Sequence, residues 1–407
     1  MSRILSPEGR GEFAVISYFP TLMGALLTLG MPQAVTTLVS KAHTNIDELL
    51  TAGFRLSVAL ALLAAPIFAL GAPLSLTGDN HRLATQVALA CVCGPFMIIT
   101  PYFHAMAYGL KRFMWVNRVT IIGQSGYVVS LIGLWFFGVC TPLTAVLSAL
   151  ACQVLQFLIH LLHIRPSCLT ASVGRESYKS ILRLGWRLAI PSLALVILSN
   201  ADRALLIRTT TLEQIGYFST AFALTFPITL TTEAFTQIGF VEISSSDDHI
   251  ASLQLTLRRF QMSQVVAILC FLLACTVIDP VIRYGFGIAY VKAIPAAYPL
   301  ALTMCLRAVS RTLENSLRGL NFILPGTLSA TVNIAGLVCL SFLWVPRWGA
   351  IGFSYASLVS QVLYLASLLA FLATRPSVNP QMLWGLRLSI AGAMTRALWA
   401  LCKRVEV

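Results

Sequence analysis

The stretch SPEGRGEF, residues 6–13, leads the chain from a polar turn directly into a long apolar run. A related stretch stands 205 residues later, because GYFS at 216–219 corresponds to GEFA at 11–14. Each copy follows a polar turn with a glutamate, Glu8 in the first and Glu213 in the second. Self-similarity at a fixed offset indicates a repeated architecture. The chain is therefore predicted to contain two similar halves.

A second pair of segments supports this repeat. Gly109-Leu110 precedes Leu134-Trp135, and the matching segments, 210 and 209 residues later, are Gly319-Leu320 and Leu343-Trp344. In membrane transporters built from two repeats, the substrate site lies between the repeats near the bilayer midplane. A transport site between the two halves is therefore the expectation.

Composition indicates a membrane protein. Of 407 residues, 57% are hydrophobic and 11% are charged, whereas about 25% are charged in a soluble domain. Apolar runs of about 20 residues recur, each long enough to cross a hydrocarbon core about 30 Å thick as a helix. Backbone polar groups must be satisfied within the segment in lipid, so these runs are predicted to be helical. The loops are too short for a soluble catalytic domain, so we do not expect an enzyme.

The predicted fold is an all-α polytopic membrane protein with two pseudo-symmetric helical bundles and about eleven or twelve transmembrane helices. The expected spans lie at about 13–39, 50–76, 84–109, 115–138, 142–164, 183–208, 214–242, 261–284, 294–317, 322–345 and 350–373, with a further one at 382–402. The expected domains are an N-terminal transmembrane lobe at 1–165, a cytoplasmic linker at 166–182, a C-terminal transmembrane lobe at 183–375, and an extra membrane or interfacial helix at 376–407.

Lysine and arginine concentrate in alternate loops, which predicts the orientation of the chain. This pattern explains the net charge of +13, so nucleic acid is not an expected partner. The richer loops, assigned to the cytoplasm, contain Lys41; Lys111, Arg112 and Arg118; Arg165, Arg175, Lys179 and Arg183; Arg258 and Arg259; Arg318; and Arg375. The 165–182 loop is therefore predicted to be cytoplasmic, and the 209–213 turn to lie outside.

The two halves differ in one respect. A complete predicted span at 183–208 precedes GYFS at 216–219, whereas GEFA at 11–14 has no span before it. The expectation is that the first helix of the N-terminal lobe is missing, through a misplaced start or a real truncation.

Three motifs follow one another along the chain: SPEGRGEF at 6–13, NADR at 200–203 and GYFSTA at 216–221. Together with the repeat, they closely resemble the polysaccharide flippase (Wzx-type) branch of the multidrug/oligosaccharidyl-lipid/polysaccharide (MOP) exporter superfamily, over nearly the whole chain. The resemblance implies a MATE/MOP-like fold with an alternating-access cavity. It also implies transport of an undecaprenyl-pyrophosphate-linked oligosaccharide, such as an O-antigen, capsule or exopolysaccharide repeat unit, across the bacterial inner (plasma) membrane.

The same resemblance implies three kinds of partner: the lipid-linked oligosaccharide, membrane lipids, and the polysaccharide polymerase and glycosyltransferases of the pathway. No cofactor is expected. If transport is coupled to an ion, the candidates are H⁺ and Na⁺. The 10 cysteines are spread without CxxC pairs or matching histidines. This spacing is typical of packing residues rather than of a metal site.

Ionisable residues within a span usually face a cavity or one another. Arg307, Arg311 and Glu314 are four and three residues apart, which places them on one helical face. Glu314 can reach Arg311, and Glu233 is a second carboxylate at similar depth in the same lobe. Arg307 then remains for a pyrophosphate, to which a guanidinium offers paired donors. The alternative is a structural ion-pair network between two helices.

Further candidates lie nearer the ends of the spans. Asp202 and Arg203 are candidates for a gate at the outer face, or side chains that reach the membrane surface. Arg10 is a candidate contact for the substrate head group, or part of a helix-capping turn. Arg55 and Arg118 are candidate contacts on the entry side, or contacts to anionic lipid.

Uncharged polar residues and histidines complete the set. Polar side chains that either line a sugar-accepting cavity or bond neighbouring helices are Gln124, Ser125, Tyr127, Gln153 and Gln156. The histidines at His104, His160 and His163 are isolated in the sequence, and either couple protons or lie at the membrane surface.

Two alternative functions remain beside the flippase. One is a cation-coupled exporter of drugs or small molecules with the same fold, whose cavity would need carboxylates, whereas the clearest deep charges here are arginines. The other is an inactive truncated flippase, because loss of a first helix would open one lobe.

Overall fold

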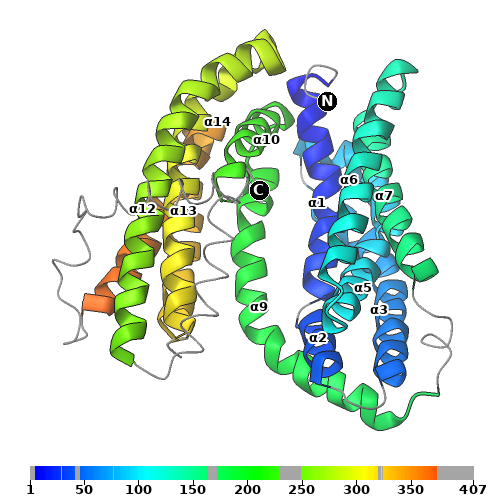
Figure 1. The fold of residues 1–407 in the computed structure, drawn as a ribbon. Helices are drawn as coiled ribbons and strands as arrows, with labels where there is room; N and C mark the ends of the chain where they lie inside the picture. The colour runs from blue at the N-terminus through cyan, green and yellow to red at the C-terminus, as the bar shows by residue number, and fades with distance from the viewer. Residues whose placement is uncertain are drawn as a thin grey trace, which may run out of the picture. The chain divides into compact units, whose positions relative to one another are not determined.

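The computed structural model describes residues 5–28, 30–41, 46–76, 78–163, 172–229, 249–319, 322 and 324–373. In this part of the chain the ordered elements are all helices (Figure 1). Seven of the described helices are long and apolar enough to cross a membrane, or eight if α1 and α2 form one bent span. The all-helical, multi-pass prediction is therefore confirmed. The predicted span at 382–402 and Glu233 lie outside the described residues.

The described helices follow the predicted order. They are α1 (Pro7–Leu27), α2 (Met31–Lys41), α3 (Ile46–Leu74), η1 (Gly78–Leu83), α4 (Ala84–Val92), α5 (Phe96–Gly109), α6 (Phe113–Phe136), α7 (Pro142–His163), α9 (Arg175–Thr209), α10 (Leu212–Thr225), α12 (His249–Pro280), η2 (Val281–Phe286), η3 (Ile288–Ala293), α13 (Ile294–Gly319) and α14 (Leu324–Ala373).

The first helix begins earlier than predicted and then bends. Ser6 caps α1, since its Oγ accepts a hydrogen bond from the Gly9 backbone N at 3.2 Å, and Pro7 follows at the first helical position. The supposed polar turn at 6–13 is therefore mostly the first turns of the helix. The expected span at 13–39 consists of α1 and α2, which meet at an angle of 46°. Gly30, with φ +66°, provides the left-handed residue at this break.

Helix α9 also begins earlier than predicted, inside the expected 166–182 linker. Its start is fixed to α3 by Glu48, whose Oε1 accepts hydrogen bonds from the Gly174 backbone N and the Ser177 Oγ, both at 2.7 Å. The N-terminal part of α9 runs across the ends of α2 and α3 (Figure 1). These contacts extend the helix beyond its apolar segment.

The last described helix contains the two predicted spans 322–345 and 350–373. They are separated at Gly349, whose backbone has φ 54° and ψ −131°, three residues after Pro346. The break at Gly349 interrupts the helical hydrogen bonds, and the backbone N of Ala350 donates instead to Gln214 Oε1 of α10 at 3.0 Å. The break therefore has a side-chain partner.

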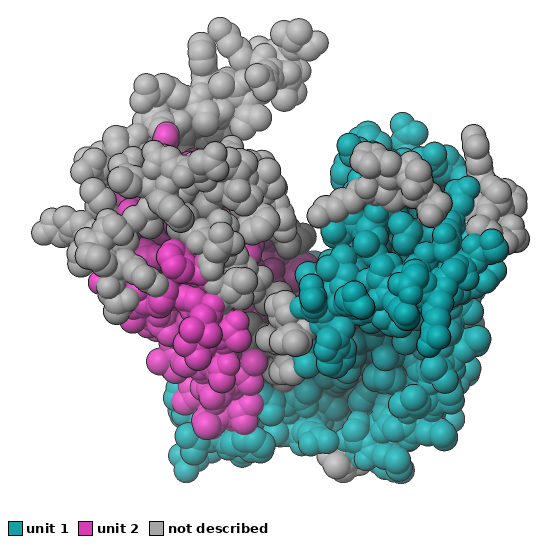
Figure 2. Space-filling view, turned by 90° about the horizontal axis from the view of Figure 1, so that it is seen from below, with its two compact units in different colours: residues 1–220, 282–293, 341–353 teal, residues 221–281, 294–340, 354–407 magenta. Residues whose placement is uncertain are grey.

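The helices form two compact units, coloured in Figure 2. Unit 1 comprises 1–220, 282–293 and 341–353, and unit 2 comprises 221–281, 294–340 and 354–407. Short segments of the second sequence half thus belong to unit 1. The domain boundaries predicted at 165, 182 and 375 stay predictions.

Each unit has its own core. In unit 1, large side chains such as Ile16, Met23, Tyr102 and Phe103 are fully buried among α1, α2, α3 and α5. In unit 2, α12 packs along α13. There a buried polar chain links α13 to α14, with Gln361 Nε2 donating to Ser310 Oγ at 3.2 Å and Asn333 Nδ2 donating to Gln361 Oε1 at 3.3 Å.

Candidate functional site

Two glycines from the repeated stretches bring α1 and α10 into backbone contact within unit 1. A Cβ atom on Gly11 would lie 1.9 Å from the carbonyl oxygen of Leu212, and one on Gly216 would lie 1.8 Å from that of Pro7. No side chain fits at such distances. The two short stretches GEFA and GYFS, both in unit 1, therefore pack directly on each other, which the repeat in the sequence did not predict.

Arg10 lies beside this contact. Its guanidinium carbon is 5.2 Å from the centre of the Phe13 ring, a cation–π geometry. Tyr127 of α6, Tyr290 of η3 and the exposed Arg203 of α9 contribute to the electrostatic environment of Arg10. We call Arg10, Tyr127, Arg203 and Tyr290 the arginine–tyrosine cluster. Sequence reasoning assigned Arg10 and Arg203 to separate roles, and the structure brings them together.

Tyr290 was not found from the sequence. It is 1% exposed, and its hydroxyl donates to the backbone oxygen of Leu5 at 2.7 Å. This bond holds the segment before α1 against η3. The only sequence signal is an aromatic residue after the GFG turn at 285–287, and nothing in the spacing relates it to Arg10.

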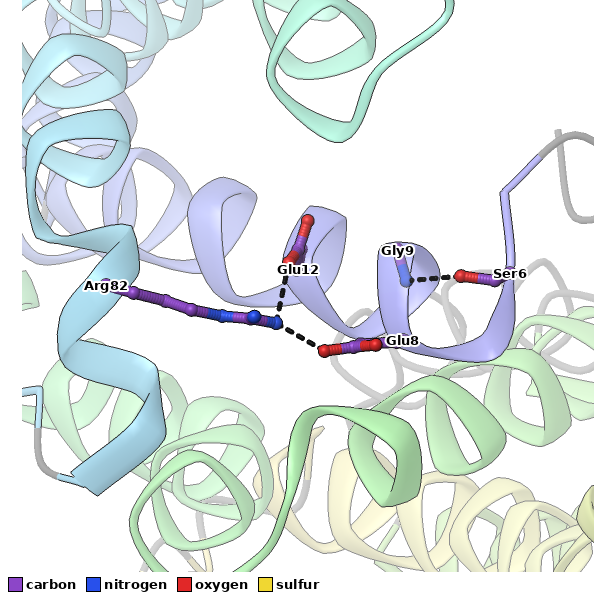
Figure 3. A network of polar contacts seen from close by, with 5 residues as sticks. All are labelled: Ser6, Glu8, Gly9, Glu12 and Arg82. Atoms are coloured by element: carbon purple, nitrogen blue, oxygen red, sulfur yellow. Dashed lines mark hydrogen bonds and ion pairs between the residues drawn. The ribbon is translucent and has the colours of Figure 1, made fainter.

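Arg82 of η1 reaches across to α1, as Figure 3 shows. Its Nη2 contacts the carboxylates of Glu8 and of Glu12, the latter at 2.9 Å. Both Arg82 and Glu8 are about half exposed, so these pairs contribute at most about 1 kcal/mol. A cavity of about 700 Å³ lies here, lined by Ser6, Glu8, Arg82, Thr211 and Glu213 among others. It is a polar pocket at the same end of unit 1 as the glycine contact.

The predicted cluster on α13 lies in unit 2, and its members have different environments. Glu314 is 5% exposed and accepts a hydrogen bond from the Tyr364 hydroxyl at 2.6 Å. Gly326 leaves room for it, because a Cβ there would be 3.0 Å from Glu314 Oε1. Arg311 is exposed and Arg307 is half-buried. The predicted contacts of Arg311 with Glu314 and with Glu233 stay predictions.

The remaining charged and polar candidates are distributed over unit 1. Arg55, Arg118, Gln124 and Ser125 are exposed, and Gln153 is half-buried. Asp202 lies in α9, and its side chain is outside the described part of the structure. Gln156 is buried against Gly123 of α6, where a Cβ would lie 2.2 Å from its Nε2. Gln156 therefore fills a helix–helix contact, the structural alternative named above.

The histidines, isolated in the sequence, come together because α5 packs on α7 and α6 on α7. The rings of His104 and His160 have centroids 5.1 Å apart. Trp115 Nε1 donates to His160 Nδ1 at 3.3 Å, and the indole stacks on His163 at 3.8 Å. His160 is 1% exposed in this contact. A cavity of about 510 Å³ is lined by Trp115, His160 and His163 together with Asp47 and Arg112.

Comparison with known proteins identifies the family. The model of the family described as polysaccharide biosynthesis protein matches residues 1–295. The chain belongs to the polysaccharide biosynthesis protein family. No curated protein sequence matches it at a significant level.

Solved structures show the fold of this family member. An inward-facing multidrug resistance MATE family transporter of the MOP superfamily is 13% identical with a TM-score of 0.75, covering 92% of each chain. The lipid II flippase MurJ in an inward closed conformation is 15% identical with a TM-score of 0.73, covering 91% of this chain and 82% of its own. A MOP superfamily transporter from Pyrococcus furiosus is 13% identical with a TM-score of 0.61, covering 90% and 88%. The predicted MATE/MOP-like fold is confirmed.

Proposed function

We propose that this protein transports an undecaprenyl-pyrophosphate-linked oligosaccharide across the bacterial inner membrane by alternating access. Membership of the polysaccharide biosynthesis protein family supports a glycan pathway. The fold shared with a lipid II flippase supports a lipid-linked cargo. The polysaccharide polymerase and the glycosyltransferases of that pathway are the proposed protein partners.

The observation that carries the proposal is the arginine–tyrosine cluster. Arg10 and Arg203 come from helices that are distant in sequence, and their like charges lie within electrostatic reach of each other. An anion between them removes this repulsion, and a pyrophosphate accepts two-pronged hydrogen bonds from each guanidinium. The Tyr127 and Tyr290 hydroxyl groups add polar atoms at the same place. A cationic drug would meet repulsion here, which favours the flippase over the cation-coupled exporter.

The α13 residues form a second proposed contact set in unit 2. Arg307 is the proposed phosphate ligand there, and Arg311 and Glu314 are the proposed charges beside it. Arg55 and Arg118 are proposed to meet the anionic head group on entry.

The test measures transport by the full chain in proteoliposomes. The cargo is a fluorescent oligosaccharide linked to undecaprenyl pyrophosphate, and its movement is followed by loss of access to a membrane-impermeant quencher. Arg10→Ala and Arg203→Ala should each lower the initial rate at least tenfold, because each removes a paired phosphate contact. Arg10→Lys should recover only part of the rate, since an ammonium is a point charge.

Arg347→Ala is the matched control. Arg347 is an exposed arginine of the same unit, outside the cluster. Its removal should leave the rate within about twofold, and all variants should reconstitute in equal amounts. Equal rates for wild type, Arg10→Ala and Arg203→Ala would show that the cluster does not bind the cargo.

A further inference from the structure

A cavity of about 510 Å³ lies in unit 1 where α3 begins, α5 and α6 join, and α7 ends. Its volume falls in the range of about 300–1,000 Å³ that is typical of small-molecule sites. The apolar part of its lining consists of Ile46, Leu50, Met106, Ala107 and Leu110, and the polar part of Asp47, Arg112, Trp115, His160 and His163. The proposed transport function does not use this cavity.

Trp115 forms a fixed wall of the cavity. Its Nε1 donates to Nδ1 of His160 at 3.3 Å, and His160 is 1% exposed, so the indole is anchored to a buried ring. The exposed His163 stacks on the same indole, with ring centroids 3.8 Å apart. One face of the indole is therefore covered, and the His163 ring is held at the cavity.

Arg112 is placed in the lining by a tight turn between α5 and α6. Lys111 has φ 57°, a left-handed backbone that is uncommon for a residue with a side chain. The Lys111 backbone N donates to the Tyr108 oxygen at 2.9 Å, and the Arg112 backbone N donates to the Ala107 oxygen at 2.8 Å. These bonds close the turn. The exposed guanidinium of Arg112 thereby shares one cavity with the exposed carboxylate of Asp47, in the first turn of α3.

The two opposite charges favour a zwitterionic ligand. The guanidinium of Arg112 offers paired donors to a phosphate, and His163 adds a ring nitrogen beside it. Asp47 repels a ligand that is only anionic, but it accepts hydrogen bonds from a primary ammonium, which has three donors. A quaternary ammonium donates none and instead binds open aromatic faces. Because His163 covers one face of Trp115, the lining favours a primary ammonium with a phosphate.

Exposed apolar side chains beside the cavity favour a lipid over a soluble molecule with the same groups. Phe113 and Met114 follow Arg112 directly and are 55% and 67% exposed, and Leu162 precedes His163 and is 88% exposed. In a multi-pass protein, such side chains face hydrocarbon. A ligand at Arg112 and His163 can therefore keep its acyl chains in the membrane.

We propose that this cavity binds the head group of phosphatidylethanolamine, with the ammonium at Asp47 and the phosphate at Arg112 and His163. The lipid would join the start of α3 to the α5–α6 turn and to the end of α7. This proposal does not depend on the cargo that the protein transports.

The experiment uses native mass spectrometry of the purified full chain. The protein is offered equal amounts of phosphatidylethanolamine, phosphatidylcholine and phosphatidylglycerol with identical acyl chains. It should retain phosphatidylethanolamine about threefold to fivefold more than either of the others, the ratio that one exposed ion pair supplies. A surface that attracts lipid only by its positive charge prefers the anionic phosphatidylglycerol. That preference in the wild-type protein would overturn the proposal.

A competition arm distinguishes the lipid from a soluble ligand. Excess glycerophosphoethanolamine carries the same ammonium and phosphate without acyl chains, and it should leave the bound phosphatidylethanolamine in place. Its displacement of the lipid would reassign the cavity to a soluble phosphate and overturn the lipid proposal.

Substitutions test the two charges separately. Asp47→Asn should remove the preference for phosphatidylethanolamine over phosphatidylglycerol, and Asp47→Lys should reverse it, while the melting temperature without added lipid stays unchanged. Arg112→Gln should lower the retention of all three lipids. Glu176→Gln is the matched control, because this carboxylate is 85% exposed in unit 1 and lies outside the cavity lining. Wild-type preference in both Asp47 variants would refute the head-group assignment.

Discussion

At the scale of single residues, the glycines Gly11 and Gly216 let the backbones of α1 and α10 touch within unit 1. Their correspondence is visible in the sequence, because both open an apolar run after a glutamate-containing turn. The contact between Gly11 and Gly216 cannot be read from the sequence. A repeat shows that two positions are equivalent, but it does not show that they touch. Each glycine permits a backbone approach that any Cβ would block. The pair therefore fixes the crossing of α1 and α10.

The Gly11→Ala protein should be less stable by about 3 kcal/mol, because a methyl group placed 1.9 Å from a carbonyl oxygen forces the backbones apart. Unfolding in mixed micelles measures this change. Gly133→Ala is the control, in open space on α6, and should be neutral or more stable by up to about 1 kcal/mol. Equal stabilities of the two variants would mean that α1 and α10 do not cross at Gly11.

The candidate site could be predicted from the sequence only in part. Arg10 stands out in the polar stretch before the first apolar run, and Arg203 stands out beside Asp202 near the end of a span, which are local properties. Their convergence depends on how α1 packs with α9, which no spacing reveals. Tyr290 and Arg82 were missed for the same reason. Glu314 is buried, but its bond to Tyr364 joins residues 50 positions apart and could not be predicted from spacing.

At the scale of elements, hydropathy predicted the positions of the helices more accurately than the residues at which they begin. Apolar runs placed α6 and α7 within a few residues. The starts of α1 and α9 were predicted too late, because Ser6 capping and the Glu48 bonds add polar turns to each helix. In unit 2, buried side-chain hydrogen bonds join α13 to α14. Lipid offers no hydrogen-bond donors that would compete with them.

The bond between α13 and α14 gives a prediction for this scale. Tyr364→Phe keeps the ring but removes the donor to the buried Glu314 carboxyl, which should lower the free energy of unfolding by about 1–3 kcal/mol. Unfolding in detergent measures it. Tyr355→Phe is the matched control on α14, since Tyr355 is 44% exposed, and it should be neutral. No difference between the two would contradict a stabilising role for the bond.

At the scale of the whole molecule, the loop alternation predicted from charge agrees with the contacts inside unit 1. Residues near 8, 82 and 211 line one cavity, while residues near 47, 112 and 163 line another. Loops predicted to share a side of the membrane therefore lie together. Which of the two ends is cytoplasmic follows only from the positive-inside rule.

Cysteine labelling tests the orientation. In a protein whose 10 native cysteines are replaced, Thr211→Cys should react with an impermeant maleimide in intact cells. Arg175→Cys should react only after lysis, because its loop is rich in lysine and arginine. Both positions are exposed, so access is matched. Labelling of residue 175 in intact cells would reverse the predicted topology.

This member of the polysaccharide biosynthesis protein family is proposed to move an anionic lipid-linked glycan. The most direct measurement offers proteoliposomes of the purified wild-type protein two cargoes in parallel. One is a fluorescent undecaprenyl-pyrophosphate-linked oligosaccharide, and the other is a fluorescent cationic drug. We predict movement of the glycolipid above the rate of empty liposomes and no movement of the drug. Transport of the drug, with the glycolipid remaining in its original leaflet, would contradict the proposed flippase function.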